Sequence, residues 1–291
     1  RMLPYMTDSP DLGSTKEGAL GIVEQLRGGA KNRLSYDQIR LMISILMKAN
    51  SRYGVYQPYR IPTDLAIVRA RPLENSGEYY GLKEDLGPPP SDKTFGFGRC
   101  HQPGRPVGYW SLYEDTALAE VRAELGQQYL ISTFVIPKGS LLVPVGEFDY
   151  FRRTGQTYLG QTVEQTAKNY NALLDRADWH LFALFDAFFS DEFLRPAINQ
   201  TDYKITSAIA DILFNCDLGL GKIDAIFYPS VAYRAGTNFA VRGELFKSKM
   251  QPFPDQTKIV EVTDVFGYGI CNYRVLTTLK SVNPDGSISW S

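Results

Sequence analysis

Residues 115–145 read DTALAEVRAELGQQYLISTFVIPKGSLLVPV and contain both kinds of secondary structure that decide the fold class. Asp115 is a suitable N-cap for a helix ending near Leu125, because apolar side chains recur between them at the spacing of one helical face. Two runs rich in apolar and β-branched residues follow, 131–136 and 141–145, separated by a Pro-Lys-Gly turn. The stretch therefore predicts a helix followed by two strands.

The alternation of helices and strands continues on both sides of this stretch. Ser35 and Gln38 form a capping box ahead of an apolar helical stripe, and residues 163–193 also have a helical pattern. The clearest helical stripe has apolar residues at i, i+3, i+4, i+7 and i+8, namely Ile205, Ala208, Ile209, Ile212 and Leu213. Further strands are expected at 65–68, 225–228, 258–266, 273–282 and 287–290. We therefore predict an α+β fold in which helices pack against a mainly antiparallel sheet.

The predicted elements divide the chain into a helical N-terminal part and a mixed body. Residues 51–62 contain Gly, Pro and three tyrosines, which is typical of a linker. We place an N-terminal helical extension at residues 1–60 and a catalytic domain at residues 61–291. Within the latter, residues 73–103 are rich in Gly, Pro and charge, so we expect a long surface loop there.

Composition excludes several classes of protein. The chain has 31 Lys and Arg against 32 Asp and Glu, a net charge of -1, so it lacks the broad cationic surface that nucleic acid or an anionic membrane requires. Its three cysteines, Cys100, Cys216 and Cys271, are far apart, which argues against a disulfide framework and a structural zinc site. The most apolar stretch is too short to span a bilayer, and no export signal is recognisable. We expect a protein that acts in the cytoplasm, either its own or that of a target cell.

Familiar nucleotide and metal motifs are missing. No phosphate-binding loop of the G-x-x-x-x-G-K-[ST] type occurs, and Gly219-Leu220-Gly221 follows a predicted helix, which is typical of a helix stop. With His101 and His180 as the chain's only histidines, H-E-x-x-H zinc chemistry cannot be assembled. We therefore expect no metal site.

Four ordered blocks of polar residues near predicted strand ends resemble the RES domain. They are Arg69 with its neighbours, the segment Gly98 to Tyr109, the segment Thr116 to Val121, and Tyr228-Pro229-Ser230 followed by Gly236-Thr237-Asn238. The resemblance covers roughly residues 65–241. It implies an ADP-ribosyltransferase-like fold and the activity of bacterial toxins that destroy NAD by hydrolysis or phosphorolysis, or transfer its ADP-ribose to protein.

The resemblance also implies which residues act. The family is named after an Arg, a Glu and a Ser, and these match Arg69, Glu120 and Ser230, which we predict as the catalytic set. For substrate binding, Arg99 matches a second arginine and Tyr109 an aromatic residue at the end of the following strand, and Asn238 is a further candidate. Many members have an aromatic residue and then Asn after that second arginine, where this chain has Cys100 and His101.

These residue types suit the cleavage of NAD. The planar fork of an arginine can grip pyrophosphate oxygens through paired hydrogen bonds, which assigns binding to Arg69 or Arg99. Loss of nicotinamide leaves positive charge on the ribose ring, and an ionised carboxylate such as Glu120 would stabilise that charge in the transition state. Ser230 could hydrogen-bond the nicotinamide ribose or amide, and Tyr109 could stack on the nicotinamide ring.

Each residue also has an ordinary interpretation. Taken alone, Glu120 is a solvated helix carboxylate, Arg69 a surface strand residue, Ser230 and Asn238 turn residues, and Tyr109 a core residue. The order of the blocks favours an NAD glycohydrolase, with water or phosphate as acceptor and NAD as substrate, without a further cofactor. A mono-ADP-ribosyltransferase and a non-catalytic NAD sensor stay open. The resemblance also implies a helix-turn-helix antitoxin as partner, and a homo-oligomer is open.

Overall fold

The computed structural model describes residues 15–51, 58–74, 79–159, 164–215, 218–233 and 235–291. The chain divides into two compact units. Unit 1 groups residues up to 58 with 97–101 and 143–222, and unit 2 comprises 59–96, 102–142 and 223–291. Because the helices of 143–222 group with the N-terminal helices, the units do not follow a boundary at residue 60. A separate extension over residues 1–60 stays a prediction.

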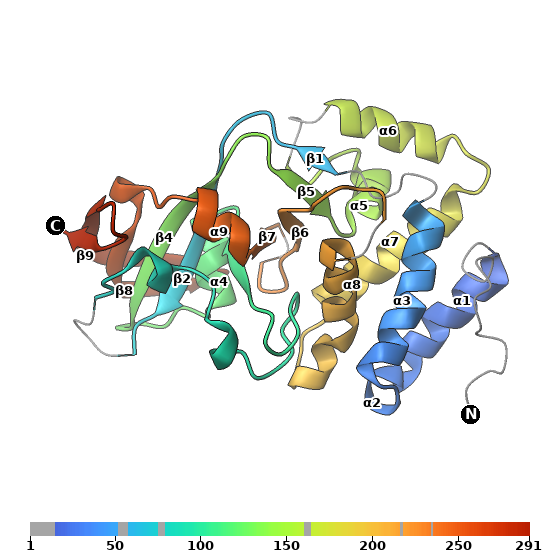
Figure 1. Ribbon diagram of the computed structural model, residues 1–291, viewed down its shortest axis with the longest axis horizontal. Helices are drawn as coiled ribbons and strands as arrows, with labels where there is room; N and C mark the ends of the chain where they lie inside the picture. Colours follow the sequence, from blue (N-terminus) through green and yellow to red (C-terminus); the bar gives the residue numbers. More distant parts are fainter. Residues whose placement is uncertain (1–14, 52–57, 75–78, 160–163, 216–217, 234) are drawn as a thin grey trace. The chain divides into compact units, whose positions relative to one another are not determined.

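Unit 1 is helical (Figure 1), and its helices are α1 (Lys16–Gln25), α2 (Lys31–Arg33), α3 (Tyr36–Ser51), α5 (Glu147–Thr154), α6 (Glu164–Leu174), α7 (Trp179–Leu194) and α8 (Lys204–Asn215). The predicted capping box begins α3, since Ser35 N–H donates to Gln38 Oε1 at 2.9 Å and Gln38 N–H donates to Ser35 Oγ at 3.2 Å. Helix α3 packs against α8, whose predicted apolar stripe is buried. Both helices therefore form where the apolar spacing predicts them.

Unit 2 is built on a sheet whose order is β1-β5-β6-β7-β3-β2-β4-β8-β9-β10. Every pair with a defined register is antiparallel, which confirms the α+β fold class with a mainly antiparallel sheet. The strands are β1 (Tyr59–Arg60), β2 (Leu65–Pro72), β3 (Val107–Ser111), β4 (Gln128–Ile136), β5 (Leu141–Pro144), β6 (Ala225–Pro229), β7 (Thr237–Arg242), β8 (Lys258–Gly267), β9 (Ile270–Val282) and β10 (Ile288–Trp290).

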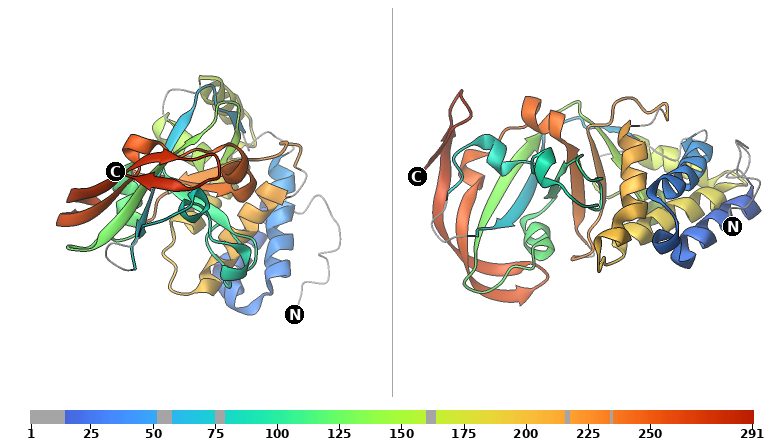
Figure 2. Two further views of the ribbon diagram at one scale, coloured as in Figure 1. Left: turned by 60° about the vertical axis from the view of Figure 1, so that its left-hand side comes forward. Right: turned by 60° about the horizontal axis from the view of Figure 1, so that its bottom comes forward.

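Two short helices, α4 (Glu114–Glu120) and α9 (Gly243–Lys249), lie on opposite sides of β2 (Figure 2). Because side chains alternate along a strand, β2 serves both sides. Ala70 and, next to it on the same face, Val68 pack with Leu118 of α4. Arg69 lies instead over the ring of Trp110, which stacks on Phe246 of α9. Residues adjacent in β2 therefore contribute to two different environments.

Helix α4 is shorter than the sequence predicts. It begins at Glu114 and ends at Glu120, whereas the apolar spacing favours a helix from Asp115 to about Leu125. Arg122 adopts the left-handed conformation, with φ 51°, and this turns the chain out of the helix. Leu125 is consequently 71% exposed instead of packed. Glu120 is therefore the last residue of the helix and not a residue of its middle.

Several short elements were not predicted from the sequence. Strand β3 and strand β7 pair along their whole lengths, from Val107↔Arg242 to Ser111↔Asn238. Neither shows a distinctive local pattern, because β3 contains a glycine and β7 follows a turn closely. Asn238 is therefore a buried strand residue and not a turn residue. Helices α5 and α9 were likewise not predicted. Cys100 and Cys271 form no disulfide, and Cys216 lies outside the described residues.

The turn between β8 and β9 packs directly against the backbone of α4. Gly269 has φ 78°, and a Cβ built there would lie 1.7 Å from the carbonyl oxygen of Asp115 and 2.8 Å from Ala119 N. No side chain fits between the two backbones. Glycine is therefore required at this position for conformation and for space, and the turn fixes α4 against the sheet.

We predict that Gly269→Ala destabilises unit 2 and disturbs α4. A left-handed alanine alone costs about 1–2 kcal/mol, and the overpacking adds about 1–3 kcal/mol. Urea unfolding measures the loss. Gly104→Ala is the matched control, because Gly104 has φ 73° but no atom within 4 Å of a built Cβ, so this variant should show the conformational cost alone. Equal losses in both variants would contradict the close approach of the turn to α4.

Candidate active site

Glu120, at the end of α4, is held by two side chains from β6 and β7. Ser230 Oγ and Asn238 Nδ2 both donate hydrogen bonds to Glu120 Oε1, each at 2.6 Å. Hydrogen bonds to an ionised carboxylate are stronger than those between neutral groups, about 1.5–3 kcal/mol each. Ser230 and Asn238 follow Glu120 by 110 and 118 positions in the sequence, and both bind the same carboxylate oxygen.

Asn238 is fixed from its other side as well. Its Oδ1 accepts a hydrogen bond from Ser111 Oγ at 2.7 Å, and Ser111 is the register partner of Asn238 across β3 and β7. Both side chains are buried. The amide group therefore has one orientation, in which its N–H points at the carboxylate.

Ser230 follows β6 and is completely buried. Its N–H donates to the carbonyl of Gly236, which closes the turn between β6 and β7, and its Oγ accepts from Tyr233 N–H at 3.0 Å. A Cβ at Gly236 would meet Thr116 of α4 at 2.5 Å, so the turn lies directly on the helix. The hydroxyl is engaged with Glu120 and Tyr233, and this arrangement fits a residue that orients the carboxylate.

The second oxygen of Glu120 is available. Glu120 is an exposed residue, and the hydrogen bonds from Ser230 and Asn238 both end on Oε1. Within the described part of the chain, Oε2 has no hydrogen bond or ion pair. The site therefore presents one oriented carboxylate oxygen to solvent, which is the geometry required to stabilise a developing positive charge.

A family model, described as the RES domain, matches residues 68–258. The matched range is about two thirds of the chain and contains every residue that we predict for the site.

The chain belongs to the RES domain family.

Membership supports, at the level of the family, an NAD-acting enzyme associated with toxin–antitoxin pairs. No curated protein and no solved structure matches the chain. None of the helices in the described ranges has the length and apolar character that a membrane crossing requires. In the same ranges, no three His, Cys, Asp or Glu side chains lie together as a metal site would need.

Arg69 of this RES domain is not part of the cluster around Glu120. Its Nη1 donates to the carbonyl of Gly87 at 2.6 Å, and its guanidinium lies 5.8 Å from the centre of the Trp110 ring. No hydrogen bond or ion pair among the described residues joins Arg69 to Glu120. The two are linked through the strands, since Val68 pairs with Ser111 and Ser111 pairs with Asn238.

Tyr109 lies on β3 near the point where β3 and β2 stop pairing. Val68↔Ser111 is the register pair between these strands, whereas β3 and β7 pair throughout. Burial and the charge of Arg71 lower the pKa of Arg69 to about 9, and Tyr80 and Tyr109 act in the opposite direction. Tyr109 is therefore close enough to Arg69 to influence its charge, although along β3 it alternates with Trp110 and shares a strand face with Ser111.

Arg99 belongs to unit 1. Its Nη1 donates to the carbonyl of Phe193, at 2.5 Å, and its guanidinium lies 5.3 Å from the centre of the Tyr203 ring. The next residues depart from the family pattern, and a Cβ at Gly98 would meet the ring of His101 at 2.2 Å. Arg99 thus joins the end of α7 to the 3-10 helix Gln200–Tyr203 that precedes α8, and substrate binding by Arg99 stays a prediction.

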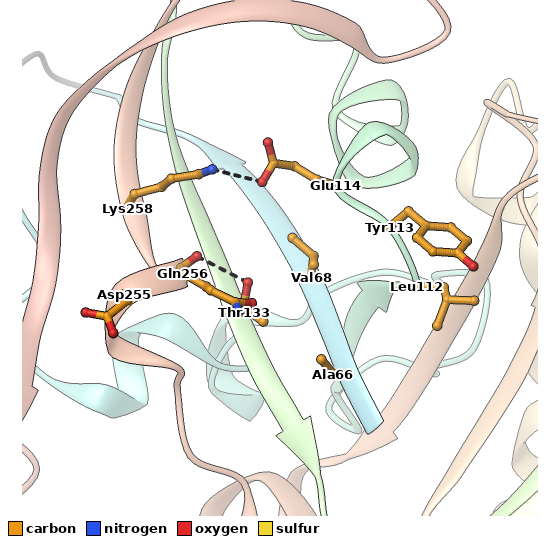
Figure 3. A pocket seen from close by; sticks show the side chains of 9 residues that line it. All are labelled: Ala66, Val68, Leu112, Tyr113, Glu114, Thr133, Asp255, Gln256 and Lys258. Atoms are coloured by element: carbon orange, nitrogen blue, oxygen red, sulfur yellow. Dashed lines mark hydrogen bonds and ion pairs between the residues drawn. The ribbon is translucent and has the colours of Figure 1, made fainter. Parts of the chain in front are cut away.

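A surface cavity lies near the other end of α4 and contains none of the predicted site residues (Figure 3). Lys258 and Glu114 approach each other across it, with Nζ and Oε2 3.1 Å apart, and Tyr273 donates to Glu114 Oε1 at 2.6 Å. The first residue of α4 is thereby anchored to β8 and β9, as the last one is to β6 and β7. We assign this cavity a structural role in placing α4.

Three residues near the predicted site were missed by the sequence analysis: Ser111, Arg71 and Gly87. Arg71 was detectable as a second arginine two positions after Arg69, because residues at i and i+2 share one face of a strand. Ser111 had no local signal, since its role depends on the register between β3 and β7. Gly87 precedes the Pro88-Pro89-Pro90 run in the predicted loop.

We predict that Asn238→Asp destabilises the RES domain by about 1–3 kcal/mol at pH 8, because it replaces an N–H donor to Glu120 by a second carboxylate. Protonation of either carboxylate restores a hydrogen bond, so stability should recover as the pH falls toward 5. Urea unfolding at both pH values measures this. Asn272→Asp is the control, because Asn272 also donates to a carboxylate, Asp264, but at an exposed site. A variant as stable as the parent at pH 8 would contradict the hydrogen bond.

Proposed function

We propose that this RES domain cleaves the bond between nicotinamide and ribose in NAD, as an NAD glycohydrolase. The observation that supports this most directly is the carboxylate of Glu120, with Oε1 fixed by Ser230 and Asn238 and Oε2 open to solvent. The family supplies NAD as the ligand. NAD is the substrate in this proposal, and no further cofactor or metal takes part.

The role of Glu120 follows from where charge appears during the reaction. As the C1′–N bond breaks, nicotinamide leaves with the electron pair and positive charge spreads over C1′ and the ring oxygen of the ribose. Oε2 would accept a hydrogen bond from a ribose hydroxyl and lower the energy of this cation. The stabilisation is larger for the cation than for the substrate, because the carboxylate is already oriented before the reaction.

A water molecule then attacks C1′ and loses a proton to solvent, so that the products are ADP-ribose, nicotinamide and a proton. If inorganic phosphate attacks instead, the product is ADP-ribose 1″-phosphate. Ser230 and Asn238 act as positioning residues in either case, since both bind Glu120 Oε1. The hydroxyl of Ser230 is buried and bonded to Glu120 and to Tyr233 N–H, which favours a positioning role over direct contact with the substrate.

Two other functions use the same residues. A mono-ADP-ribosyltransferase would bring a protein side chain to C1′ in place of water, and a sensor would bind NAD without cleavage. Nicotinamide release separates the three: the glycohydrolase releases it from NAD alone or with phosphate, the transferase requires an acceptor protein, and the sensor releases none. An antitoxin partner, which the family supports in general terms, would act by limiting this release.

We predict that Glu120→Gln lowers kcat for nicotinamide release by about 100-fold to 1,000-fold, the usual effect of losing one oriented charge-stabilising group. The amide oxygen can still accept from Ser230 and Asn238, so the fold should be retained. The measurement is chromatographic detection of nicotinamide from purified protein and NAD. Glu124→Gln serves as the matched control, because Glu124 is an exposed carboxylate four residues further along.

If Glu120→Gln turned over NAD at the parent's rate, Glu120 would not be the charge-stabilising group. If the parent released no nicotinamide with NAD alone, with phosphate, or with a mixture of acceptor proteins, the enzyme proposal itself would fail. Thermal unfolding of each variant distinguishes loss of chemistry from loss of structure.

A further inference from the structure

Two arginines of β2 converge on one carbonyl group. Arg69 Nη1 donates to the carbonyl oxygen of Gly87 at 2.6 Å, and Arg71 Nη2 donates to the same oxygen at 2.9 Å. Arg71 Nη1 also donates to the carbonyl of Asp85 at 2.6 Å. Because residues two apart lie on one face of a strand, both guanidinium groups project to the same side of β2.

The positive charge of this pair is not balanced by any carboxylate among the described residues. In the part of the chain that the structure describes, neither Arg69 nor Arg71 has an ion pair with a carboxylate. Their shared acceptor is a neutral carbonyl, and the charge of Arg71, after burial, is a cause of the lowered pKa of Arg69. With a pKa of about 9, Arg69 keeps its charge at neutral pH. Two like charges held together in this way favour an anionic ligand.

Each guanidinium group also lies over an aromatic ring. The guanidinium carbon of Arg69 lies 5.8 Å from the centre of the Trp110 ring, and that of Arg71 lies 5.5 Å from the centre of the Tyr80 ring. An arginine held against an aromatic ring keeps the N–H groups at its edge available for hydrogen bonds. Each arginine has five N–H donors, and on carbonyl groups of the described residues Arg69 uses one and Arg71 two, which leaves further donors for a ligand.

The shared carbonyl is fixed by packing. Gly87 follows a 3-10 helix, Lys83–Leu86, and its N–H donates to the carbonyl of Glu84 at 3.0 Å. A Cβ at Gly87 would lie 2.2 Å from the ring of Phe246, so only glycine allows this approach of the loop to α9. The loop therefore holds the arginines at a defined separation before any ligand is present.

We propose that Arg71 acts together with Arg69 as a two-arginine site for the diphosphate of the substrate, and that it makes the enzyme selective for a dinucleotide over a nucleoside. The identity of the substrate rests on the proposed NAD cleavage. The anion chemistry rests on the arginine pair alone. A diphosphate carries oxygens on two linked phosphorus atoms, so it can engage two planar guanidinium groups at once.

Truncated substrates test this selectivity directly. NAD contains the diphosphate, nicotinamide mononucleotide one phosphate, and nicotinamide riboside none, whereas all three contain the bond that is cleaved. We expect Arg71→Gln, which removes the charge and the planar fork and leaves one amide group on a shorter side chain, to lower the ratio of kcat/KM for NAD to that for nicotinamide riboside by roughly ten-fold to a hundred-fold. Arg71→Lys, which keeps the charge but not the fork, should show an intermediate ratio.

Arg60→Gln is the matched control, because Arg60 also donates to a carbonyl, that of Gly139, but at an exposed position on β1. Its substrate ratio should equal that of the parent. If Arg71→Gln lowered kcat/KM for NAD and for the riboside equally, the role of Arg71 would be structural and the proposal would be overturned.

Binding without turnover separates this proposal from the proposed function. Isothermal titration with ADP-ribose and with inorganic pyrophosphate requires no catalysis, and both should bind the parent and bind Arg71→Gln roughly ten-fold or more weakly. Should the parent release no nicotinamide but still bind both ligands through Arg71, NAD cleavage would fail while the diphosphate site stood. Equal binding by parent and variant, or no binding by the parent, would overturn the site.

Discussion

The hydrogen bonds that converge on Glu120 Oε1 are the constraint on which the site depends. They join the end of α4 to the end of β6 and to the start of β7, and both donors lie at 2.6 Å. Asn238 can donate in this direction only because Ser111 of β3 occupies its carbonyl oxygen. A buried polar network of this kind is stable only when every member is satisfied. The register of β3 with β7 and the length of α4 must therefore both be correct for the carboxylate to be placed.

The anchoring of α4 explains how a helix of seven residues can carry a functional group. Such a helix is too short to be stable by itself, so tertiary contacts must hold it. Lys258 and Tyr273 hold Glu114 at its start, the glycine turn at Gly269 presses on its backbone, and β6 and β7 hold Glu120 at its end. These contacts come from parts of the chain more than 100 residues later in sequence.

Local patterns in the sequence predicted the elements whose stability is largely local. The capping box at Ser35 and the apolar stripe of α8 produced the expected helices, and β8 and β9 lie where their β-branched runs predict them. The end of α4 was wrong because the apolar spacing continues to Leu125 although Arg122 adopts a left-handed conformation. That conformation is stabilised by the return of the chain into β4, including a hydrogen bond from Glu124 N–H to Tyr129 Oη, which no local spacing reveals.

For the candidate site, the sequence indicated which residues take part but not which atoms they contact. The family resemblance located Glu120, Ser230 and Asn238, which the structure brings together, but it did not indicate that Ser230 and Asn238 bind the same oxygen. Ser111 was not predicted as a site residue, because a serine in a strand forms no recognisable local pattern and its partner Asn238 is 127 residues away. Arg71 was not predicted as a site residue because its position beside Arg69 depends on Gly87, a loop residue whose carbonyl accepts hydrogen bonds from both arginines.

The faces of β2 set a geometric condition on any ligand that uses both arginines and Glu120. Val68 and Ala70 lie on the side of α4, whereas Arg69 and Arg71 project toward Trp110 and the loop at Gly87. Adjacent strands are about 4.8 Å apart, so Val68 and Asn238, which are separated by β3, have backbones about 10 Å apart. This separation suits a ligand in which a ribose and a diphosphate are covalently linked. Because the arginines and Glu120 lie on opposite faces of β2, such a ligand would have to reach both faces. The register between β2 and β3 ends at Val68↔Ser111, two residues from Tyr109, whereas β2 stays paired with β4 along its whole length.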